Sequence, residues 1–323
     1  MSLINGTHFL VIGRAGMDLY ADPPGTEIET ATAFSAALGG SSANIAVGLC
    51  RQGASAALLT CVSDDAVGRF AKAQLDAYGV DRSLVATVGG EARNSLAVVE
   101  TRLENTQSVI YRNGAADFQM TVADVERPEY AAFDGLITTG TVFAAEPSRT
   151  AAFRAFDLAK AAGRPIIFDI DYRPYSWTSP KDAESTYARA AEMADIIVGN
   201  DLEFGFLAGD YEKGLDAARA LARHSDRIVV YKMGENGAIT LAGDDEFRTG
   251  IYRTEALKPT GAGDAFMAGF LASLAARRPL SEAVLRGSAA AAIVVSKVAC
   301  APAMPTTQEL DSFMASRPAP SPA

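Results

Sequence analysis

The sequence predicts a doubly wound α/β fold, in which a mostly parallel sheet carries helices on both faces. Short apolar runs rich in β-branched residues recur along the chain, and segments with helical spacing separate them. Buried strands joined by crossover helices produce this alternation. A chain of 323 residues with 49% hydrophobic residues can bury one large core of this kind. The predicted strands cover residues 8–12, 57–62, 135–139, 165–170, 195–198 and 227–231.

A second, smaller sheet is predicted from segments with a different pattern. Residues 96–99 and 108–111 are apolar and flank the polar residues 104–106, which is typical of a hairpin. Together with residues 17–34, the interval 91–113 can form a small sheet over the ends of the main strands. We therefore expect one domain over residues 1–310 and a C-terminal tail over 311–323, whose proline-rich last part is disordered.

Charge and composition exclude several kinds of partner. The net charge of −10 argues against nucleic acid and anionic membranes, which both require a basic face. Residues 1–10 lack the basic start and long apolar run of a signal peptide, and no stretch is long and apolar enough to span a membrane. Three cysteines, an odd number in apolar surroundings, are typical of free thiols. These features predict a cytoplasmic protein that acts on a small molecule.

Several catalytic chemistries are excluded as well. The two histidines, His8 and His224, have no metal-ligating neighbour at a useful spacing, which argues against a zinc site and a Ser/His/Asp triad. The absence of a Gly-Lys pair excludes a Walker nucleotide-binding loop. Residues 261–263 begin like the fingerprint of a Rossmann dehydrogenase, but Phe266 stands where the third glycine belongs, and the motif lies near the C-terminus.

The strongest chemical signal is the run over residues 258–266. Gly261 and Gly263 allow backbone N–H groups to converge where a helix begins, because apolar residues at helical spacing follow from Phe266 onward. N–H groups at a helix start favour a phosphate or a developing oxyanion. Asp264 lies beside them and can act as a general base or, alternatively, only as a helix cap.

Four further motifs accompany this run, at residues 39–44, 62–68, 200–203 and 232–237. In this order and at these separations, the chain resembles the ribokinase-like (PfkB) carbohydrate kinases from about residue 11 to residue 305. The resemblance implies the ribokinase-like form of the doubly wound fold, with the small sheet as a lid. It also implies ATP and Mg²⁺ as cofactors, transfer of a phosphoryl group to a sugar hydroxyl, and a homodimer formed through exposed edges of the lid.

The resemblance assigns a role in the reaction to the residues around the glycine pair. Asp264 takes the proton from the substrate hydroxyl. The backbone N–H groups of Gly261, Ala262, Gly263 and Asp264 hold the transferring group. The competing hypothesis from another class is a sugar-acid sensor without catalysis, but a pure binder does not require a base and a metal position together.

Other positions match the family's metal and nucleotide contacts. Asn200 and Glu203 have a spacing that places both side chains on one face of a starting helix, where their oxygens suit Mg²⁺ held mostly through water. An ordinary helix start explains the same pair. Ser288 matches a position near the adenine in the family. A helix of small residues that serves only for packing explains this stretch equally well. The predicted nucleotide-binding residues are Asn200, Lys232, Gly234, Gly237 and Ser288.

Asp18, Gly40 and Asn44 match the positions that contact sugar hydroxyls in the family. Ser41 stands where some relatives carry a lysine, so the contacts of that lysine are in doubt here. A plain turn is the alternative explanation for the glycine pair at 39–40.

Arg112 and Arg173 indicate an acidic substrate. Two guanidinium groups that face one cleft can bind a carboxylate with bidentate hydrogen bonds, as in the keto-sugar-acid kinases of the family. The alternative is a salt bridge within the protein, between Arg173 and Asp169 or Asp171. Residues 13–25, 256–264 and 295–306 look most like kinases that phosphorylate the 6-hydroxyl of 5-dehydro-2-deoxy-D-gluconate. The runner-up substrate is 2-keto-3-deoxygluconate.

Lys258 departs from the wider family, which often has an aspartate there that helps to hold a monovalent cation near the anion-binding loop. The lysine ammonium is a compact positive charge. We therefore expect K⁺ to be unnecessary, because Lys258 occupies or repels the cation. The competing expectation is that Lys258 points into solvent.

Overall fold

The computed structural model describes residues 3–223 and 227–321. Within these residues, a large sheet is built from β1 (His8–Ile12), β4 (Ser55–Ser63), β5 (Val85–Val88), β8 (Gly135–Thr139), β9 (Ile166–Asp169), β10 (Ile196–Asn200), β11 (Ile228–Lys232), β12 (Ala238–Ala242) and β13 (Asp245–Thr249). Neighbouring strands follow the order β13–β12–β11–β10–β9–β8–β1–β4–β5. Pairing is parallel from β11 to β5 and antiparallel among β11, β12 and β13. The mostly parallel sheet confirms the predicted fold class.

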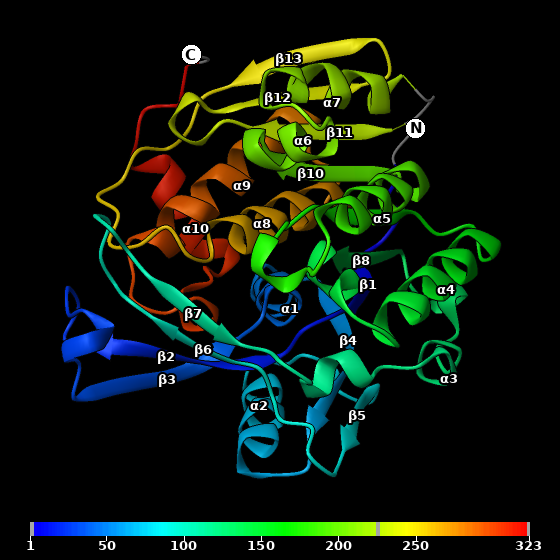
Figure 1. Ribbon diagram of the computed structural model, residues 1–323. Coiled ribbons are helices and arrows are strands. Elements are labelled where there is room, and N and C mark those ends of the chain that lie inside the picture. The colour runs from blue at the N-terminus through cyan, green and yellow to red at the C-terminus, as the bar shows by residue number, and fades with distance from the viewer. Residues whose placement is uncertain (1–2, 224–226, 322–323) are drawn as a thin grey trace.

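Helices cover both faces of this sheet (Figure 1). The core on one face includes Phe9 and Val11, whereas the core on the other includes Leu10 and Ile12. Successive residues of a strand point to opposite faces, so a continuous apolar run marks a strand that is buried on both sides. The first face carries α1 (Ser41–Arg51), α2 (Ala66–Ala77), α8 (Ala262–Ala275), α9 (Leu280–Val295) and α10 (Thr307–Ala315). The second carries α3 (Val122–Val125), α4 (Ser148–Ala161), α5 (Pro180–Met193), α6 (Asp201–Leu207) and α7 (Gly214–Ala222).

The predicted strands agree closely with the observed ones. β1 and β8 coincide with the predicted residues, and β4, β9, β10 and β11 differ only at their ends. β5, β12 and β13 were not predicted. β13 lies at the edge of the sheet and is largely exposed, so it lacks the apolar run by which buried strands are recognised.

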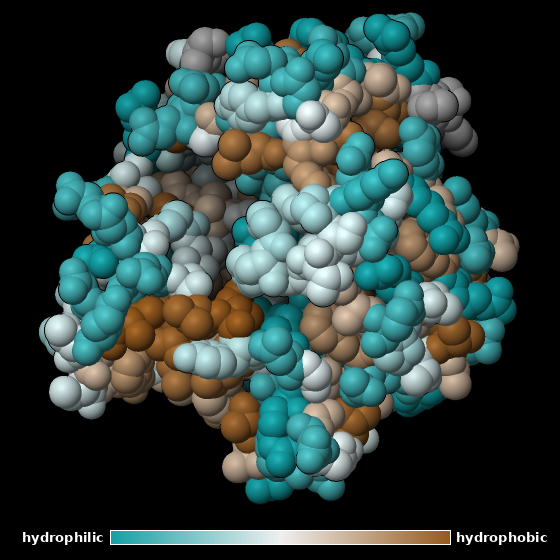
Figure 2. Space-filling model, in the orientation of Figure 1, coloured by the Kyte–Doolittle hydropathy of each residue, from teal (hydrophilic) through white to brown (hydrophobic). Residues whose placement is uncertain are grey.

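A small sheet projects from the body of the molecule at the lower left of Figure 1. It contains β2 (Gly16–Asp22), β3 (Ala33–Gly39), β6 (Leu96–Val99) and β7 (Ser108–Tyr111), in the order β3–β2–β6–β7. β6 and β7 form the predicted hairpin, and β2 pairs with β6 in parallel. β3 extends beyond the predicted segment 17–34. Figure 2 shows hydrophobic residues gathered over these strands, and Val109 and Tyr111 of β7 are exposed.

The C-terminal helix α10 crosses the boundary predicted at residue 310. A capping box formed by Thr306 and Glu309 starts this helix, Leu310 is buried, and Arg286 Nη1 lies 2.6 Å from Asp311 Oδ1. The first part of the predicted tail is therefore a packed helix, and the capping signal was overlooked. Residues 322–323, part of the tail expected to be disordered, lie outside the described residues. No helix in residues 3–223 and 227–321 is both long and apolar enough to cross a membrane.

Candidate active site

The predicted site residues gather at the carboxyl edge of the large sheet. Asn200 and Lys232 are paired at the ends of β10 and β11, and Asp171 and Arg173 follow β9. The strand order reverses at β1, which lies between β8 and β4. In an open α/β sheet, this reversal opens a crevice that binds ligands. The fold therefore places these residues where a ligand is expected.

The start of α8 has an unusual backbone and no side-chain cap. Gly261 precedes the helix with a φ of +85°, and no side chain caps the helix. A Cβ at Gly261 would lie 2.5 Å from Cys300 Sγ, so both the backbone conformation and the available space require glycine. Lys232 Nζ is 3.7 Å from the position that a Cβ on Gly263 would occupy. The first turn of α8 therefore has N–H groups that no side chain caps, and a lysine ammonium lies near Gly263.

Asp264 lies in the first turn of the same helix. Asn44 Nδ2 donates a hydrogen bond to Asp264 Oδ2 at 2.7 Å, although the two residues are 220 positions apart. Burial raises the pKa of Asp264 to about 7, the Asp171 carboxylate also raises it, and the bond from Asn44 acts in the opposite direction. A carboxylate with a pKa near neutral pH is suited to proton transfer in both directions.

Arg14, Asp18 and Asn44 contribute buried polar atoms to the site. Arg14 Nη2 and Asp18 Oδ1 are 3.5 Å apart in a buried ion pair, and Arg14 Nε donates to Ser95 Oγ at 2.6 Å. Within the described part of the chain, Asn44 Oδ1 is buried and has no hydrogen-bond partner. A buried polar atom without a partner is rare in folded proteins. The sequence analysis did not select Arg14, although it follows β1 at the carboxyl edge.

Gly40 shapes the turn between β3 and α1. Its φ is +101°, and a Cβ would lie 2.4 Å from the carbonyl oxygen of Arg14. Asn44 N donates to Gly40 O at 2.8 Å in the first turn of α1. Gly40 therefore allows the close approach that presents Asn44 to Asp264.

Arg112 follows β7 and is bound to a carboxylate of the protein. Its Nε and Nη2 donate to Asp117 Oδ2 at 3.0 and 2.5 Å, and its Nη1 donates to Thr141 O at 2.9 Å. The guanidinium carbon lies 4.0 Å from the centre of the Phe118 ring. Asp117 Oδ1 is buried without a hydrogen-bond partner among the described residues. Arg112 is thus held rigidly.

Arg173 also has a carboxylate partner, since its Nη2 lies 2.6 Å from Asp171 Oδ1. The salt bridge considered as an alternative is therefore present, and it involves Asp171. Ser41 Oγ donates to Asp171 Oδ2 at 2.6 Å. Asp171 has a φ of +39°, an uncommon conformation that often occurs at functional sites. The Arg173 side chain is 47% exposed, so part of its guanidinium group remains accessible.

Tyr175 lies among charged groups of both signs. Burial raises its pKa, and so does the Asp171 carboxylate, whereas the positive charges of Arg173, Arg14 and Arg112 act in the opposite direction. Each of these three guanidinium groups already lies beside a carboxylate of the protein.

Asn200 and Glu203 form a capping box at the start of α6. Glu203 N donates to Asn200 Oδ1 at 2.9 Å, and Asn200 N donates to Glu203 Oε2 at 2.7 Å. Tyr172 N donates to Glu203 Oε1 at 3.3 Å. The ordinary helix start is thus present, and both oxygens of Glu203 already accept backbone N–H groups. Among residues 3–223 and 227–321, no three His, Cys, Asp or Glu side chains form a metal-binding group. Asn200 and Glu203 therefore fit a metal ion only through bridging water molecules. His224 lies outside the described residues.

Asp169 is a member of the site that the sequence analysis missed. It is buried at the end of β9, where burial raises its pKa well above the ordinary range and the charge of Lys232 acts in the opposite direction. Asp171 and Glu203 raise the pKa of Asp169 further. The pattern Asp-Ile-Asp-Tyr-Arg after a buried strand contained the signal, but only the arginine was selected.

The remaining predicted nucleotide contacts have clear structural roles. Gly234 and Gly237 have φ values of +55° and +82° in the turn between β11 and β12, and a Cβ on Gly237 would lie 1.9 Å from Thr249 O. Ser288 Oγ accepts a hydrogen bond from Tyr252 N at 3.2 Å. The turn requires glycine, and Ser288 anchors a loop to α9.

Lys258 is 0% exposed and directly precedes residues 259–264, the candidate anion-binding loop. Its Nζ donates to Thr260 O at 2.5 Å and lies 3.6 Å from Cys300 Sγ. The expectation that Lys258 points into solvent is therefore wrong. Its charge is fixed beside the peptide that leads into Gly261.

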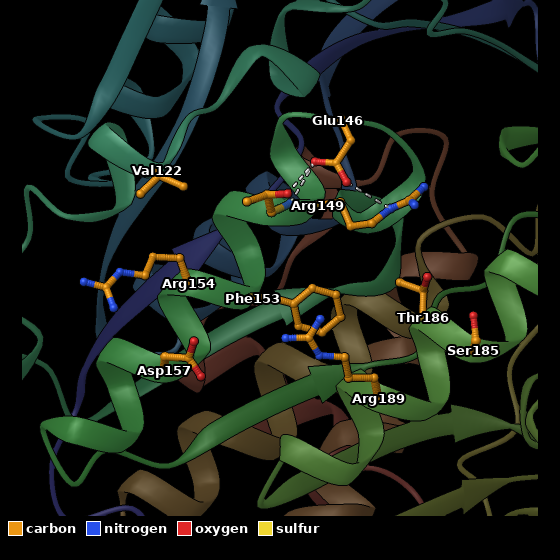
Figure 3. Close-up of a pocket in the computed structure, with 10 residues that line it drawn as sticks. Val122, Glu146, Arg149, Phe153, Arg154, Asp157, Ser185, Thr186 and Arg189 are labelled. Atoms are coloured by element: carbon orange, nitrogen blue, oxygen red, sulfur yellow. Dashed lines mark hydrogen bonds and ion pairs between the residues drawn. The ribbon is translucent and has the colours of Figure 1, made fainter.

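A hollow of about 580 Å³ lies between α4 and α5, away from these residues. Figure 3 shows Phe153 of α4 and Arg189 of α5 in this hollow. The guanidinium carbon of Arg189 lies 3.8 Å from the centre of the Phe153 ring, and Arg154 Nη2 pairs with Glu126 Oε1 at 2.7 Å. None of the predicted site residues lines the hollow, so its size alone does not make it the active site.

Comparisons with known proteins identify the family of this chain. The profile of the pfkB family carbohydrate kinases matches residues 7–307. The 5-dehydro-2-deoxygluconokinase of Photobacterium profundum is 36% identical over 314 residues, covering 95% of each chain. The protein of that name from Geobacillus kaustophilus is 34% identical over 311 residues, which cover 95% of this chain and 93% of the relative. The crystal structure of a PfkB protein from Polaromonas sp. JS666 has a TM-score of 0.82 and 28% identity, covering 96% of this chain and 99% of that chain. The chain therefore belongs to the pfkB family of carbohydrate kinases.

Proposed function

We propose that this kinase transfers the terminal phosphoryl group of ATP to the 6-hydroxyl of 5-dehydro-2-deoxy-D-gluconate, giving the 6-phosphate and ADP. One observation carries the chemistry: Asp264, whose pKa is raised to about 7, lies in the first turn of a helix whose start is not capped by any side chain. The names of the relatives from Photobacterium profundum and Geobacillus kaustophilus support the substrate.

In this proposal, Asp264 accepts the proton of the attacking hydroxyl, and Asn44 orients the carboxylate through their 2.7 Å hydrogen bond. The N–H groups of residues 261–264 stabilise the oxygens of the transferring phosphoryl group. Mg²⁺, held through water near Asn200 and Glu203, would neutralise phosphate charge. We assign the nucleotide to the surface formed by Asn200, Lys232, Gly234, Gly237 and Ser288.

We assign the sugar acid to the part of the site around Asp18, Gly40 and Asn44. These residues contact hydroxyl groups of the substrate, one of which supplies the missing partner of Asn44 Oδ1. Arg112 and Arg173 bind the carboxylate. Without substrate, Asp117 and Asp171 keep the two guanidinium groups in place, and the substrate carboxylate competes for the accessible part of Arg173.

The test is ADP formation from Mg-ATP with 5-dehydro-2-deoxygluconate and 2-keto-3-deoxygluconate in parallel, compared as kcat/KM. We expect a large preference for the first acid, and a loss of about a hundredfold in Arg173→Gln, since one charge-assisted hydrogen-bonding group is removed. Preference for the second acid would make 2-keto-3-deoxygluconate the substrate, and the proposed role of Asp264 would stay the same. Binding of an acid without ADP formation would instead favour the non-catalytic sensor.

We further propose that the ammonium of Lys258 takes the place of a monovalent cation behind the anion-binding loop. Its burial and its bond to Thr260 O support this role. The kinase is then expected to show the same kcat in K⁺ as in a buffer free of K⁺ and Na⁺. Strong activation by K⁺ would contradict the proposal.

The small sheet is proposed to act as a lid that excludes water during transfer. Its edge strands β3 and β7 are proposed to pair in a homodimer. The cytoplasm is the expected location, since all three cysteines are free.

A further inference from the structure

We propose that Tyr20 and Cys300 are positioning residues that couple the small sheet to the anion-binding loop. They do so through a buried chain of contacts from Asp18 to the peptide joining Thr260 and Gly261. The inference rests on the proposed phosphoryl transfer, because Asp18 is assigned to the acceptor sugar and the loop to the phosphoryl group. Tyr20 and Cys300 themselves touch neither reactant.

This series of contacts begins on β2. Asp18 and Tyr20 are two positions apart on this strand and therefore point to the same face of the sheet. Tyr20 is fully buried. Its hydroxyl lies 3.3 Å from Asp18 Oδ2 and 3.2 Å from Cys300 Sγ. A phenol has a single proton to donate, so the carboxylate and the sulfur share one hydroxyl group.

The series of contacts ends at the peptide between Thr260 and Gly261, which begins the anion-binding loop. Cys300 Sγ lies 3.6 Å from Thr260 O and 3.6 Å from Lys258 Nζ, which itself donates to Thr260 O. The sulfur also occupies the space beside Gly261 where a side chain would otherwise extend. Movement of the sulfur therefore acts directly on the peptide that begins the loop.

Packing makes this connection rigid. Tyr20 and Cys300 belong to a buried cluster that is separate from the two cores of the large sheet, together with Ala37, Ala97 and Val99 of the small sheet. β3 of the small sheet also packs against residues 301–303, which directly follow Cys300. A closely packed cluster transmits a displacement because it has little free volume to absorb one. The segment around Cys300 is therefore the place where a shift of the small sheet reaches the loop.

This arrangement has a consequence for the reaction. Substrate hydroxyls that engage Asp18 change the partner to which the Tyr20 hydroxyl donates, and Cys300 passes this change to Thr260. The acceptor side and the phosphate side of the site would then be set together, which favours transfer only when the sugar is in place. Binding energies coupled in this way are reciprocal.

The kinetic test is a double-mutant cycle with Tyr20→Phe and Cys300→Ala. Loss of one hydrogen bond predicts a decrease of about fivefold to tenfold in kcat/KM for each single variant, and little further loss in the double variant. Cys300→Ala does not touch Asp18, yet it is expected to raise the KM for the sugar acid. Cys300→Ser, which keeps a hydrogen-bonding group, should recover part of the activity.

Matched controls separate positioning from general stability. Tyr130→Phe removes a buried hydroxyl whose bond to Val125 O, 2.9 Å long, is remote from the site, and Cys61→Ala removes another buried thiol. Both controls should keep the kcat/KM of the parent enzyme. The proposal would be overturned if the decreases in kcat/KM of the two single variants simply multiply in the double variant. It would also be overturned if the control variants lose as much kcat/KM as the Tyr20 and Cys300 variants.

A second readout does not require activity. Hydrogen exchange, measured by mass spectrometry on the ligand-free protein, should increase over residues 258–264 in Tyr20→Phe and over residues 16–22 in Cys300→Ala. This reciprocal change would support the coupling even if neither sugar acid is a substrate. Exchange that increases only around each substituted residue would overturn the coupling while leaving the proposed kinase reaction intact.

Discussion

The two sheets of this kinase differ in how they are buried. Strands β1, β8 and β9 of the large sheet have side chains buried on both faces. In the small sheet, β3 is exposed over its first half and β7 over most of its length. Its inner face contributes one small hydrophobic cluster. Stability is therefore concentrated in the large sheet, and the small sheet can move at a lower free-energy cost.

The groups of the site are divided between these two regions. Asp264 lies in the first turn of α8, which packs against the large sheet, whereas Asp18 lies on β2 and Arg112 follows β7 of the small sheet. In the proposed function, the general base therefore lies in the large-sheet region, and the sugar acid is contacted from both regions, because Asn44 and Arg173 also belong to the large-sheet region. Substitutions in the two regions should consequently affect different kinetic and thermodynamic quantities.

The largest expected effect comes from Asp264→Asn. Removal of a general base should lower kcat by about a thousandfold with little change in KM. The matched variant in the small sheet, Asp18→Asn, should mainly raise the KM for the sugar acid. Steady-state kinetics of both variants measure the contrast. Near-normal turnover of Asp264→Asn would remove this residue from the proposed chemistry.

Core truncations compare the two sheets in stability. Phe168→Ala in β9 should lower the free energy of unfolding by about 4 kcal/mol, because a large buried ring leaves a cavity. Val99→Ala in β6 should cost about 1.5 kcal/mol, as expected for the loss of two methyl-sized groups. Urea unfolding measures both. Losses that are equal, or larger in Val99→Ala, would contradict the view that stability resides in the large sheet.

The pH dependence tests the environment of Asp264. Because the pKa of Asp264 is raised to about 7 and the base must be ionised, kcat/KM should fall by about tenfold per pH unit below 7. The folded state holds this proton more tightly than the unfolded chain, so ionisation destabilises the fold as pH rises from about 4 to about 7.

Asp264→Asn should therefore raise the melting temperature at pH 8 and leave it nearly unchanged at pH 4. Calorimetry of the parent and variant proteins at both values checks the sign. A larger gain at pH 4 would show that the raised pKa is wrong.

The smallest effect on catalysis is expected at the edge of the small sheet. Val109→Lys places a charge on the exposed strand β7, which should weaken the proposed homodimer with little change in kcat. Sedimentation velocity at several concentrations measures the association. Glu246→Lys, on the exposed edge strand β13, is the matched control and should leave the association unchanged. A dimer unaffected by Val109→Lys would place the interface elsewhere.

Much of the fold followed from the sequence because buried strands leave a direct trace. The runs at residues 8–12 and 135–139 consist mostly of apolar residues, since both faces of β1 and β8 are covered by helices. β13 could not be recognised in this way because its side chains are largely exposed. The boundary predicted at residue 310 falls inside α10, because it did not take account of the capping signal at Thr306 and Glu309.

The site was predictable where a residue type and a local motif coincide. Asp264 and Asn44 were selected from separate motifs, and the structure joins them by a hydrogen bond. The partners of Arg112 and Lys258 were not predicted, since the contact with Asp117 depends on the local path of the chain and that with Cys300 on tertiary packing. Tyr20 and Cys300 are 280 positions apart, and no local pattern encodes a contact at that separation.

The small sheet is assembled from two separate segments of the chain, residues 16–39 and 96–111, and β2 and β6 meet through parallel pairing and through the buried cluster around Tyr20. A protein engineer cannot exchange this sheet between related kinases as one contiguous cassette. If residues 96–111 alone were replaced, every residue from Met17 to Tyr20 would face a new partner on β6. An exchange of the small sheet between related kinases therefore requires both segments to be transferred together.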